Sequence, residues 1–465
     1  MKKLTKGKIC RFFMSDIAKG FFNGMIGNYL LYFYQPTAKS GILSLLPENK
    51  FLGFITIMAF ITAIGKVLDA ITDPIVAQMS DRCKSKWGRR MPFLRFAAIP
   101  YALCVFLVFM APFNPGSAWN AIWVGLFLVL YYTAYTIFYI PHRALVPEII
   151  PDPKERVGYY AISTAFFMGS SAVMYATTLF VSFFKNMGME PIWAWRTVFG
   201  IFALVGGICL TISAFAFHEP DYVKETSNPE DSILKSFGII LKNKNFIIFS
   251  LGDLASYIAM AFFQTSMLYY ITILLNIPES MSFLVMAIAI GASICMFPLI
   301  VKISKKVNKK LPLIIGSWIF AAVFTFIFFA DNIAALVPGY ELVLGIIMGL
   351  AVSFPFACIN ILPQSILSDI IQQDTIVSGV RREGIFSAIK TFIDKIAYAV
   401  AMMIVSSVLA IGALEGESVG LLGIKLTGIF ACVFSIVSVV FFMIYNDKKV
   451  TETIENHNKE KSSDN

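Results

Sequence analysis

The chain has 465 residues, of which 57% are hydrophobic and only 14% are charged, and its mean hydropathy is +0.73. Soluble globular proteins carry about 25% charged residues, so this composition excludes a soluble multidomain enzyme. A helix that crosses a bilayer needs roughly 20 mostly apolar residues, and a chain of this length has room for about a dozen such helices. The composition therefore indicates a protein that crosses a membrane many times.

Long apolar segments follow one another with short polar links between them. Twelve are long enough to span a bilayer, near residues 14–35, 51–79, 91–113, 119–142, 157–185, 194–217, 245–275, 281–301, 311–331, 336–362, 384–412 and 420–445. An even number of spans places both termini on the same side of the membrane. The basic start of the chain lacks a small-residue cleavage site, so we expect a retained first helix and not a signal peptide.

The net charge of +9 follows from membrane topology. Nearly all Lys and Arg side chains between the predicted spans lie on the side of the termini, and the opposite side carries only Lys39, Lys50, Lys185 and Arg196. Cytoplasmic loops have such an excess of Lys and Arg. We therefore expect a multi-pass protein of the cell membrane with both termini in the cytoplasm, and the positive charge implies no nucleic-acid partner.

The predicted spans divide six and six. The longest polar interruption, the cytoplasmic central loop 218–244, separates an N-terminal six-helix bundle (1–217) from a C-terminal one (245–445), and a polar cytoplasmic tail (446–465) follows. The two halves resemble each other weakly where their first, fourth and fifth spans begin or end. Parallel six-helix halves build the major facilitator fold, in which the solute binds near the midplane between them. The sequence therefore predicts an all-α membrane protein of this fold.

A polar stripe runs along the second predicted span. Thr62, Lys66, Asp69 and Asp73 recur at the spacing of one helix face. A charge at the bilayer centre costs at least about 2.5–3.5 kcal/mol, which makes such residues functional candidates. Two carboxylates one turn apart repel each other unless a proton or a hard cation such as Na⁺ lies between them. The alternative is a structural stripe neutralised by Lys66, but one Lys cannot neutralise two Asp.

Two other spans carry polar faces. On the fourth span, Tyr135, Tyr139 and Arg143 share one face, which forms either an aromatic packing seam or the wall of a cavity. On the eleventh span, Lys390 has the spacing to pair with a carboxylate one turn away. Lys395 is then left over near the middle of the helix, and it would suit a partner for one of the two aspartates of the second span.

Motifs of enzymes are absent from the sequence. There is no phosphate-binding G-x-x-x-x-G-K-[ST] loop, and the three histidines and seven cysteines follow no metal-ligand spacing. We therefore expect no enzyme and no cofactor. A transporter without an ATPase depends on an ion gradient, so Na⁺ or H⁺ is the expected coupling ion.

The most specific motif begins in the second span. It reads KVLDAITDP at 66–74, then DR at 81–82 and KWGRRMP at 86–92. Together with segments 135–147 and 382–395, it resembles the glycoside–pentoside–hexuronide:cation symporters of the major facilitator superfamily. The resemblance covers all of the chain except its tail.

The resemblance implies a Na⁺, Li⁺ or H⁺ site built by Asp69, Asp73 and Thr136, with Lys395 nearby. Thr72 occupies a position that influences the choice of cation in the family and carries Asn there, so Na⁺ and H⁺ both remain open. The resemblance also implies a cytoplasmic gate that pairs with neighbouring helix ends in the outward-facing state, and its residues here are Asp81, Arg82, Arg89, Arg90, Arg382 and Glu383.

The solute positions match the family poorly. They are Lys19, Tyr135, Tyr139, Arg143, Thr164, Asn360, Thr391 and Lys395, of which only Lys19, Thr391 and Lys395 keep the family's residue type. Gly20 stands where the family has a carboxylate, and Arg143 stands where it has a tryptophan. The loss of carboxylates and the gain of Arg143 favour an anionic or amphipathic solute, such as a uronide or a lysolipid. A neutral glycoside remains the first choice because it is the broadest class in the family.

The sequence thus predicts cation-coupled symport of a sugar or glycoside, anionic ones included, by alternating access. The expected partners are a small-molecule solute, a cation and the lipid bilayer, and we expect the chain to function as a monomer. The alternatives are a lysolipid symporter, an uncoupled facilitator, and a non-transporting membrane sensor with the same fold.

Overall fold

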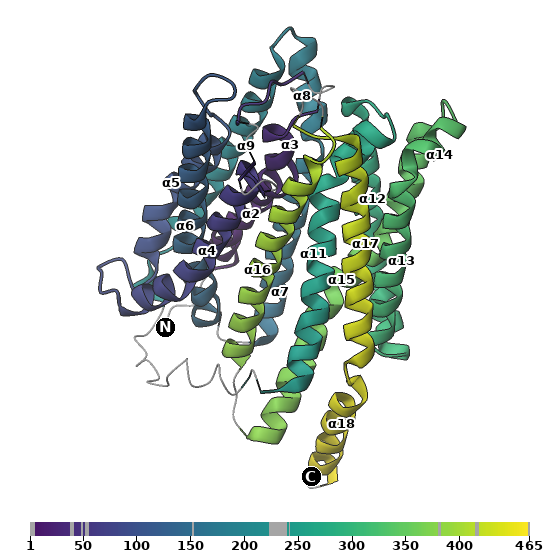
Figure 1. Cartoon of the computed structure of the whole chain (residues 1–465). Coiled ribbons are helices and arrows are strands. Elements are labelled where there is room, and N and C mark those ends of the chain that lie inside the picture. Colours follow the sequence, from purple (N-terminus) through teal and green to yellow (C-terminus); the bar gives the residue numbers. More distant parts are fainter. Residues whose placement is uncertain are drawn as a thin grey trace.

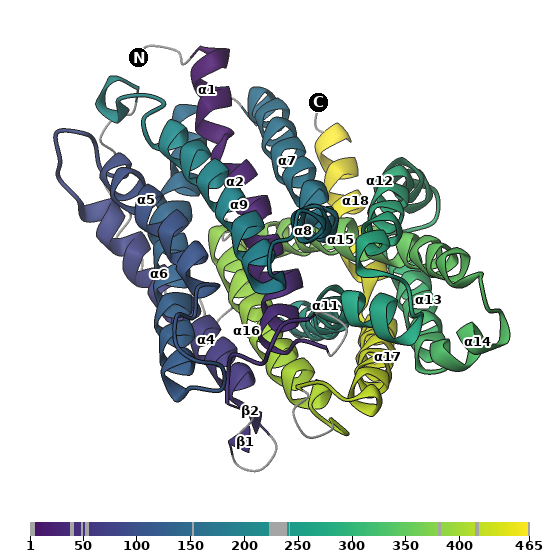
Figure 2. The same ribbon diagram turned by 90° about the horizontal axis from the view of Figure 1, so that it is seen from above.

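The computed structural model describes residues 5–37, 41–47, 50–51, 55–150, 153–222, 240, 242–379, 383–413 and 418–463. Figure 1 shows two bundles of long helices side by side, one from each half of the chain, with both termini toward the same end. We name this the termini end, and the opposite one the far end. Seen from above, α5 and α6 lie at one outer side and α13 and α14 at the other, with α11 and α16 between them (Figure 2).

Helices make up almost all of the first bundle. They are α1 (Lys6–Phe13), α2 (Ser15–Gly24), the π-helix η1 (Met25–Tyr29), α3 (Leu30–Tyr34), α4 (Ile57–Arg82), α5 (Met91–Val108), α6 (Ala118–Ile149), α7 (Pro153–Tyr175), α8 (Thr177–Asn186) and α9 (Pro191–Ala214), followed by the 3₁₀ turn η3 (Glu219–Asp221). A two-residue antiparallel ladder, β1 (Lys50–Phe51) with β2 (Ile55–Thr56), precedes α4.

The second bundle is built in the same way. Its elements are α11 (Lys244–Tyr269), the π-helix η4 (Tyr270–Leu274), the 3₁₀ turn η5 (Glu279–Met281), α12 (Ser282–Lys306), α13 (Lys310–Phe328), α14 (Ala330–Leu336), α15 (Glu341–Ser378), α16 (Glu383–Leu409), α17 (Leu421–Ile444) and α18 (Asp447–Ser463).

Ten helical segments in the described residues are long and apolar enough to cross a membrane. The two other predicted spans are helical but differ from a simple apolar helix. The first is divided among α2, η1 and α3, and the second, α4, contains the charged stripe at Lys66, Asp69 and Asp73. The total of twelve crossings therefore stays a prediction.

The predicted start of the second span at residue 51 is wrong. Residues 50–51 and 55–56 pair as a short ladder, and α4 begins only at Ile57. The hydroxyl of Thr56 accepts a hydrogen bond from the backbone N–H of Ala59 at 3.1 Å. Such a cap satisfies one of the free N–H groups of the first turn, which fixes the start of the helix there.

The two bundles pack their helices in the same order. In the first, α2 packs against α7 and α9, and in the second, α11 packs against α16 and α17. In the same way α4 packs on α6 and α12 on α15. Between the bundles, α4 packs extensively against α16, whereas α7 makes few contacts with α12. The α4–α16 contact therefore places the charged stripe of α4 at the junction of the two bundles.

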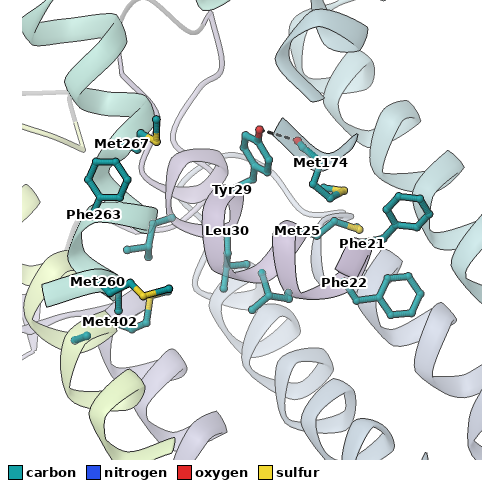
Figure 3. Packing of buried hydrophobic residues seen from close by; sticks show 14 of the residues in the cluster. Phe21, Phe22, Met25, Tyr29, Leu30, Met174, Met260, Phe263, Met267 and Met402 are labelled. Atoms are coloured by element: carbon teal, nitrogen blue, oxygen red, sulfur yellow. Dashed lines mark hydrogen bonds between the residues drawn. The ribbon is translucent and has the colours of Figure 1, made fainter. Parts of the chain in front are cut away.

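The π-helix of the first span lies between the bundles. Figure 3 shows Tyr29 and Met25 near Met174 of α7 on one side and Leu30 facing the side of Phe263 and Met260 of α11 on the other. The hydroxyl of Tyr29 donates to the carbonyl of Met174 at 2.9 Å. These side chains belong to one continuous buried core that joins both bundles.

At the far end, polar contacts hold the two bundles together. The amide of Gln35 donates to the carbonyl of Ser406 at 3.1 Å, and the hydroxyl of Tyr269 donates to the carbonyl of Gln35 at 2.9 Å. The ammonium of Lys185 pairs with the carboxylate of Glu279 at 2.9 Å. The far end is therefore closed by hydrogen bonds and by an ion pair.

At the termini end, the ion pairs in the described residues join groups of the same bundle. Arg89 and Arg90 both pair with Glu148, at 3.0 and 2.8 Å, and Lys309 pairs with Asp369 at 2.5 Å. The ion pair at the far end thus joins the two bundles, whereas these ion pairs at the termini end do not.

Candidate cation and solute site

The α4 stripe directs its charged residues toward the second bundle. The apolar residues Val67, Ile71 and Ile75 of α4 are each 51% exposed, whereas the carboxylate-bearing Asp69 is only 1% exposed. An apolar outer face and a polar inner face are what a helix at the edge of a membrane bundle requires, because a charge facing lipid is costly. This arrangement turns Asp69 and Asp73 toward α6 and α16.

Four residues from three helices meet at this point. The hydroxyl of Thr136 on α6 lies 2.9 Å from Oδ1 of Asp69 and 3.0 Å from Oδ1 of Asp73, and it has one proton to donate to either. The ammonium of Lys395 on α16 lies 3.0 Å from Oδ2 of Asp69 and 2.6 Å from Oδ2 of Asp73. Sequence reasoning expected Lys395 to pair with one of the two aspartates, and in the structure its ammonium contacts both and joins the four residues in one cluster.

A second ammonium balances the charge of this cluster. Nζ of Lys66 lies 3.5 Å from Oδ2 of Asp69, and the same ammonium is 4.2 Å from the ring centroid of Tyr132 and 5.0 Å from that of Tyr398. Aromatic faces attract a cation through their quadrupole, which holds the ammonium away from lipid. The argument that one Lys cannot neutralise two Asp is therefore incomplete, because α16 supplies the second positive charge.

The oxygen atoms of the cluster fit a small hard cation. Oδ2 of Asp69 is buried and receives no hydrogen bond of proper geometry, although two ammonium groups lie near it. Asp69, Asp73 and Thr136 together offer carboxylate and hydroxyl oxygens, which are the ligands of alkali cations and of protons. A cation bound there would replace the ammonium of Lys395 as the positive charge beside the two carboxylates.

Thr72 does not join these oxygens. Its hydroxyl donates to the backbone carbonyl of Asp69 at 3.1 Å, within its own helix. Its effect on the choice of cation stays a prediction.

Three predicted solute residues, Lys19, Tyr135 and Tyr139, lie close together beside the cluster. Tyr139 is buried, and its hydroxyl donates to the carbonyl of Ser15 at 2.6 Å. The ammonium of Lys19 lies 5.8 Å from the ring centroid of Tyr139, and the ring of Tyr135 lies 4.9 Å from that of Tyr139. Arg143 is exposed. The structure shows aromatic packing between Tyr135 and Tyr139 on this face, and the cavity wall stays a prediction.

The cation cluster and these residues are neighbours. Tyr135 is the residue next to Thr136 of the cluster on α6, and its ring lies 4.9 Å from that of Tyr139. The other predicted solute residues, Thr164, Asn360 and Thr391, are exposed on α7, α15 and α16. The side-chain amide of Asn360 donates to the carbonyl of Phe356 at 2.7 Å, within its own helix. Thr391 lies one helical turn before Lys395 on α16. The role of all three in solute binding stays a prediction.

Gly20 has no room for the carboxylate that the family carries there. A Cβ at this position would lie 2.0 Å from the hydroxyl oxygen of Ser170 and 2.7 Å from the carbonyl of Phe167. The position therefore faces α7 and serves close helix packing, for which small residues are preferred in membranes. Lys19, its neighbour, keeps a position beside the ring of Phe167, 5.2 Å from its centroid.

Two of the predicted gate residues form contacts within the first bundle. Arg89 and Arg90 pair with Glu148, and Nη1 of Arg90 also donates to the carbonyl of Ala144 at 2.6 Å. Arg82 is exposed at the end of α4. The side chains of Asp81 and Glu383, and the whole of Arg382, lie outside the described residues. Their gating role stays a prediction.

Glu219 was missed by sequence reasoning. Its Oε2 accepts hydrogen bonds from the backbone N–H groups of Arg90 and Met91, both at 2.9 Å, at the start of α5. Gly88 has a φ of +104°, and a Cβ there would lie 2.3 Å from the same oxygen. The glycine within the KWGRRMP motif was the one available signal, because it indicates a special turn.

A second charged cluster lies in the C-terminal bundle. Nζ of Lys390 is 2.5 Å from Asp253 on α11, and it also pairs with Asp394, which confirms the spacing-based ion pair. Sequence reasoning assigned no role to Asp253. Since α11 and α16 are far apart in sequence, no local pattern links Asp253 to Lys390.

Comparison with known proteins agrees with this architecture. Residues 11–449 match the family described as MFS/sugar transport protein. An uncharacterized symporter of Synechocystis sp. is 24% identical over 74% of this chain and 76% of its own length. The lactose permease of Leuconostoc lactis is 23% identical over 90% of this chain, and the match spans 66% of that permease, slightly less than two thirds. The isoprimeverose transporter of Lactiplantibacillus pentosus is 22% identical over 86% of this chain and 79% of its own length.

Solved structures with the same fold are also transporters. The nucleoside transporter NupG has a TM-score of 0.64 at 13% identity, covering 95% of this chain and 99% of that one. A D-xylose-proton symporter has a TM-score of 0.63 at 12% identity, covering 96% and 98% of the two chains. At such identities the likeness establishes the helical major facilitator type of fold. Together with the profile match over most of its length, it shows that the chain is a multi-pass membrane transporter, and not an enzyme, that belongs to the MFS/sugar transport protein family.

Proposed function

We propose that the chain is a secondary transporter that couples the entry of a sugar-like solute to the entry of Na⁺ or H⁺. The cluster of Asp69, Asp73, Thr136 and Lys395 carries this proposal, because it joins both bundles through groups that a cation would rearrange. The symporters and sugar transporters among its relatives support the same class of solute.

Coupling follows from competition between Lys395 and the cation. The two carboxylates belong to the first bundle and Lys395 belongs to the second, so this ion pair ties the bundles together. A cation that binds Asp69 and Asp73 releases the ammonium of Lys395. The released ammonium is then available to a polar group of the solute. By reciprocity, a solute that engages it strengthens cation binding equally, with typical couplings of about 1–3 kcal/mol.

The contacts at the two ends correspond to an inward-facing state. With the termini in the cytoplasm, as the Lys and Arg distribution indicates, the closed far end is the extracellular one. Arg89 and Arg90 then form ion pairs with Glu148 of their own bundle, so these ion pairs do not link the two bundles in this state. Alternating access requires the reverse arrangement in the other state.

Replacement of Asp73 by Asn tests this proposal. Asp73→Asn removes one carboxylate from the cation site but keeps the shape of the side chain, so cation-dependent accumulation should be lost. The measurement is uptake of radiolabelled lactose, xylosyl glycosides and glucuronides into proteoliposomes with an imposed Na⁺ or proton gradient. Asp331→Asn, which breaks the ion pair with Lys425 at 2.6 Å outside the cluster, is the control and should retain uptake.

Thermal unfolding shows whether the variant protein is folded. Full gradient-driven accumulation by Asp73→Asn would show that the cation does not bind at the proposed site. Wild-type uptake that ignores both gradients would identify a facilitator, and substrate-induced stabilisation without any flux would identify a sensor.

A further inference from the structure

A cationic side chain lies at the surface of the first bundle near its termini end (Figure 1). Arg95 is in the second turn of α5, one of the helices long and apolar enough to cross a membrane. Cζ of Arg95 is 5.0 Å from the ring centroid of Trp87 and 4.8 Å from that of Phe215, and these two side chains are 41% and 59% exposed. Nε of Arg95 donates to the carbonyl of Ala214 at 3.3 Å. Two exposed aromatic rings and the end of α9 thus hold the guanidinium in place.

The surroundings of Arg95 are those of a surface that faces lipid. On α5, Phe96 and Ile99 are 74% and 66% exposed, and on α9, which packs against α5, Leu204 and Ile208 are 67% and 53% exposed. Figure 2 shows α5 at an outer side of the molecule. Large apolar side chains on the outside of membrane-spanning helices contact acyl chains, which are as apolar as leucine. Arg95 therefore marks the point where this lipid-facing surface meets the termini end.

No carboxylate compensates this charge in the part of the chain that the structure describes. The contacts of Arg95 there are the carbonyl of Ala214 and the two rings, and its terminal nitrogens Nη1 and Nη2 form no hydrogen bond. The carboxylates of the nearby turn η3 are engaged elsewhere. Glu219 accepts from the backbone N–H groups at the start of α5, and Oδ1 of Asp221 lies 3.5 Å from Nδ1 of His218. Donors for an anion therefore remain on a guanidinium whose position is fixed.

A second cation lies over the same indole ring. Nζ of Lys86 is 5.8 Å from the ring centroid of Trp87, and the Lys86 side chain is exposed and pairs with no carboxylate of the described residues. The turn that carries both residues is fixed by the fold, because Gly88 has a φ of +104° and Glu219 packs against it while it caps the start of α5. Two cationic groups and an exposed indole thus form one site on the outer surface, which we name the Arg95 site.

We propose that the Arg95 site binds the headgroup of an anionic phospholipid, whose acyl chains lie along the exposed apolar side chains of α5 and α9. An Arg guanidinium forms two parallel charge-assisted hydrogen bonds to a phosphate, and Trp is enriched at the level of the headgroups. Cationic side chains near a helix end reach that level, and the cytoplasmic leaflet carries anionic lipids. The Lys and Arg distribution places the termini end in the cytoplasm, so the lipid belongs to that leaflet. This bound lipid is distinct from the solute and the cation of the proposed transport.

Two lipids with the same acyl chains test the inference. Phosphatidylglycerol and phosphatidylcholine share the phosphate and differ in the net charge of the headgroup. Their binding to the purified protein in detergent is measured by native mass spectrometry over a range of lipid concentrations. Because each cation near an anionic headgroup adds to the attraction, we expect the first phosphatidylglycerol to bind at least about tenfold more tightly than phosphatidylcholine.

Variants link that preference to the site. Arg95→Gln should weaken binding of phosphatidylglycerol by about tenfold and that of phosphatidylcholine by less than about twofold. Lys86→Gln, at an exposed side chain whose loss leaves the packing intact, should weaken binding of phosphatidylglycerol by about threefold. Trp87→Phe should keep the preference, whereas Trp87→Leu should lose much of it because the aromatic face is gone. The matched control is Lys302→Gln on α12, which removes an exposed cation that has no aromatic partner among the described residues and should have no effect. Thermal unfolding shows whether each variant is folded.

Equal affinity for the two lipids, a folded Arg95→Gln or Lys86→Gln protein with the wild-type preference, or an equal loss in Lys302→Gln would overturn the inference. Phosphatidylethanolamine that binds as tightly as phosphatidylglycerol would do the same, because the site would then not distinguish a negative headgroup. Competition identifies the source of the anion. Glycerophosphoglycerol, the same headgroup without acyl chains, should leave the bound lipid in place. If it displaces the lipid at equal concentration, the site binds a soluble anion and the inference is wrong.

Discussion

Single residues decide the electrostatics of the cation cluster. Asp69 is 1% exposed and bears a carboxylate, so its charge is tolerable only because Lys66 and Lys395 face it. Sequence spacing identified the stripe on α4, since its members repeat along one helix face. The spacing along α4 does not show that the charges of the stripe are balanced, because the second ammonium comes from Lys395, 326 positions after Asp69.

Removal of Lys395 should make the protein depend on the cation. Without its ammonium, the carboxylate of Asp73 loses its ion pair and the buried carboxylate of Asp69 keeps only Lys66. Breaking a buried ion pair by removal of one partner costs about 3–5 kcal/mol. We expect Lys395→Gln to unfold at a lower temperature than wild type in Na⁺-free buffer at neutral pH, and Na⁺ or a lower pH to restore more stability than in wild type. The measurement is the thermal unfolding of the purified protein across Na⁺ concentrations and pH values.

The matched control is Lys425→Gln, which removes an ammonium from a pair with Asp331 outside the cluster. Its stability should not respond to Na⁺. A Lys395→Gln protein with wild-type response to both ions would show that the ammonium does not compete with a cation.

At the scale of elements, close helix contacts determine which positions can bind a solute. The first span resembles the family at Lys19, but Gly20 is buried against Ser170 of α7. A neighbouring residue on a helix is turned by about 100°, so one residue can face the cavity while the next one packs against a helix. Sequence comparison identified the changed residue type at Gly20, and only the packing of α2 on α7 shows why no carboxylate fits.

Gly20→Ala should therefore destabilise the protein. The added methyl group would overlap with Ser170 and the carbonyl of Phe167, and overpacking of this kind costs about 1–3 kcal/mol. Gly169→Ala on α7 is the matched control, since a Cβ there meets nothing within 4 Å. Thermal unfolding of both variants checks this. Equal melting temperatures for the two would contradict the close α2–α7 packing.

At the scale of the whole molecule, an ion pair joins the two bundles at the far end. Lys185 and Glu279 form an ion pair between the bundles at the far end, with side chains 23% and 15% exposed. Both residues lie between long apolar segments, where the sequence offers no pattern that pairs them. The contact joins α8 to η5, so it depends on how the two bundles meet.

Reversal of this pair should shift the balance of conformations. Lys185→Glu and Glu279→Lys each place like charges opposite each other, which favours opening of the far end, and the double variant restores attraction. The measurement is the distance between spin labels on the far ends of the two bundles, in detergent without ligand. The single variants should show a larger population at long distance, and the double variant should return to the wild-type distribution.

A matched reversal at Lys309 and Asp369 serves as the control, because this pair lies within one bundle. Its variants should leave the far-end distances unchanged. If the Lys185 and Glu279 single variants also leave them unchanged, the pair does not hold the far end closed.

The sequence by itself determined what repeats locally. Apolar length located the spans, helical spacing identified the stripe of Lys66, Asp69 and Asp73, and the motif at 66–92 indicated the family. These properties depend on neighbours within one helix or one loop, so they can be read from the order of residues. The break of the first span into α2, η1 and α3 left no such pattern.

Only the tertiary structure decided which distant groups share one space. It showed that Lys395 contacts both aspartates of α4, and it joined Asp253 of α11 to Lys390 of α16. The physical reason is that charge compensation in a membrane depends on distance through space, and the residues that supply it come from helices far apart in the chain. The balance of charge is therefore a property of the assembled bundles.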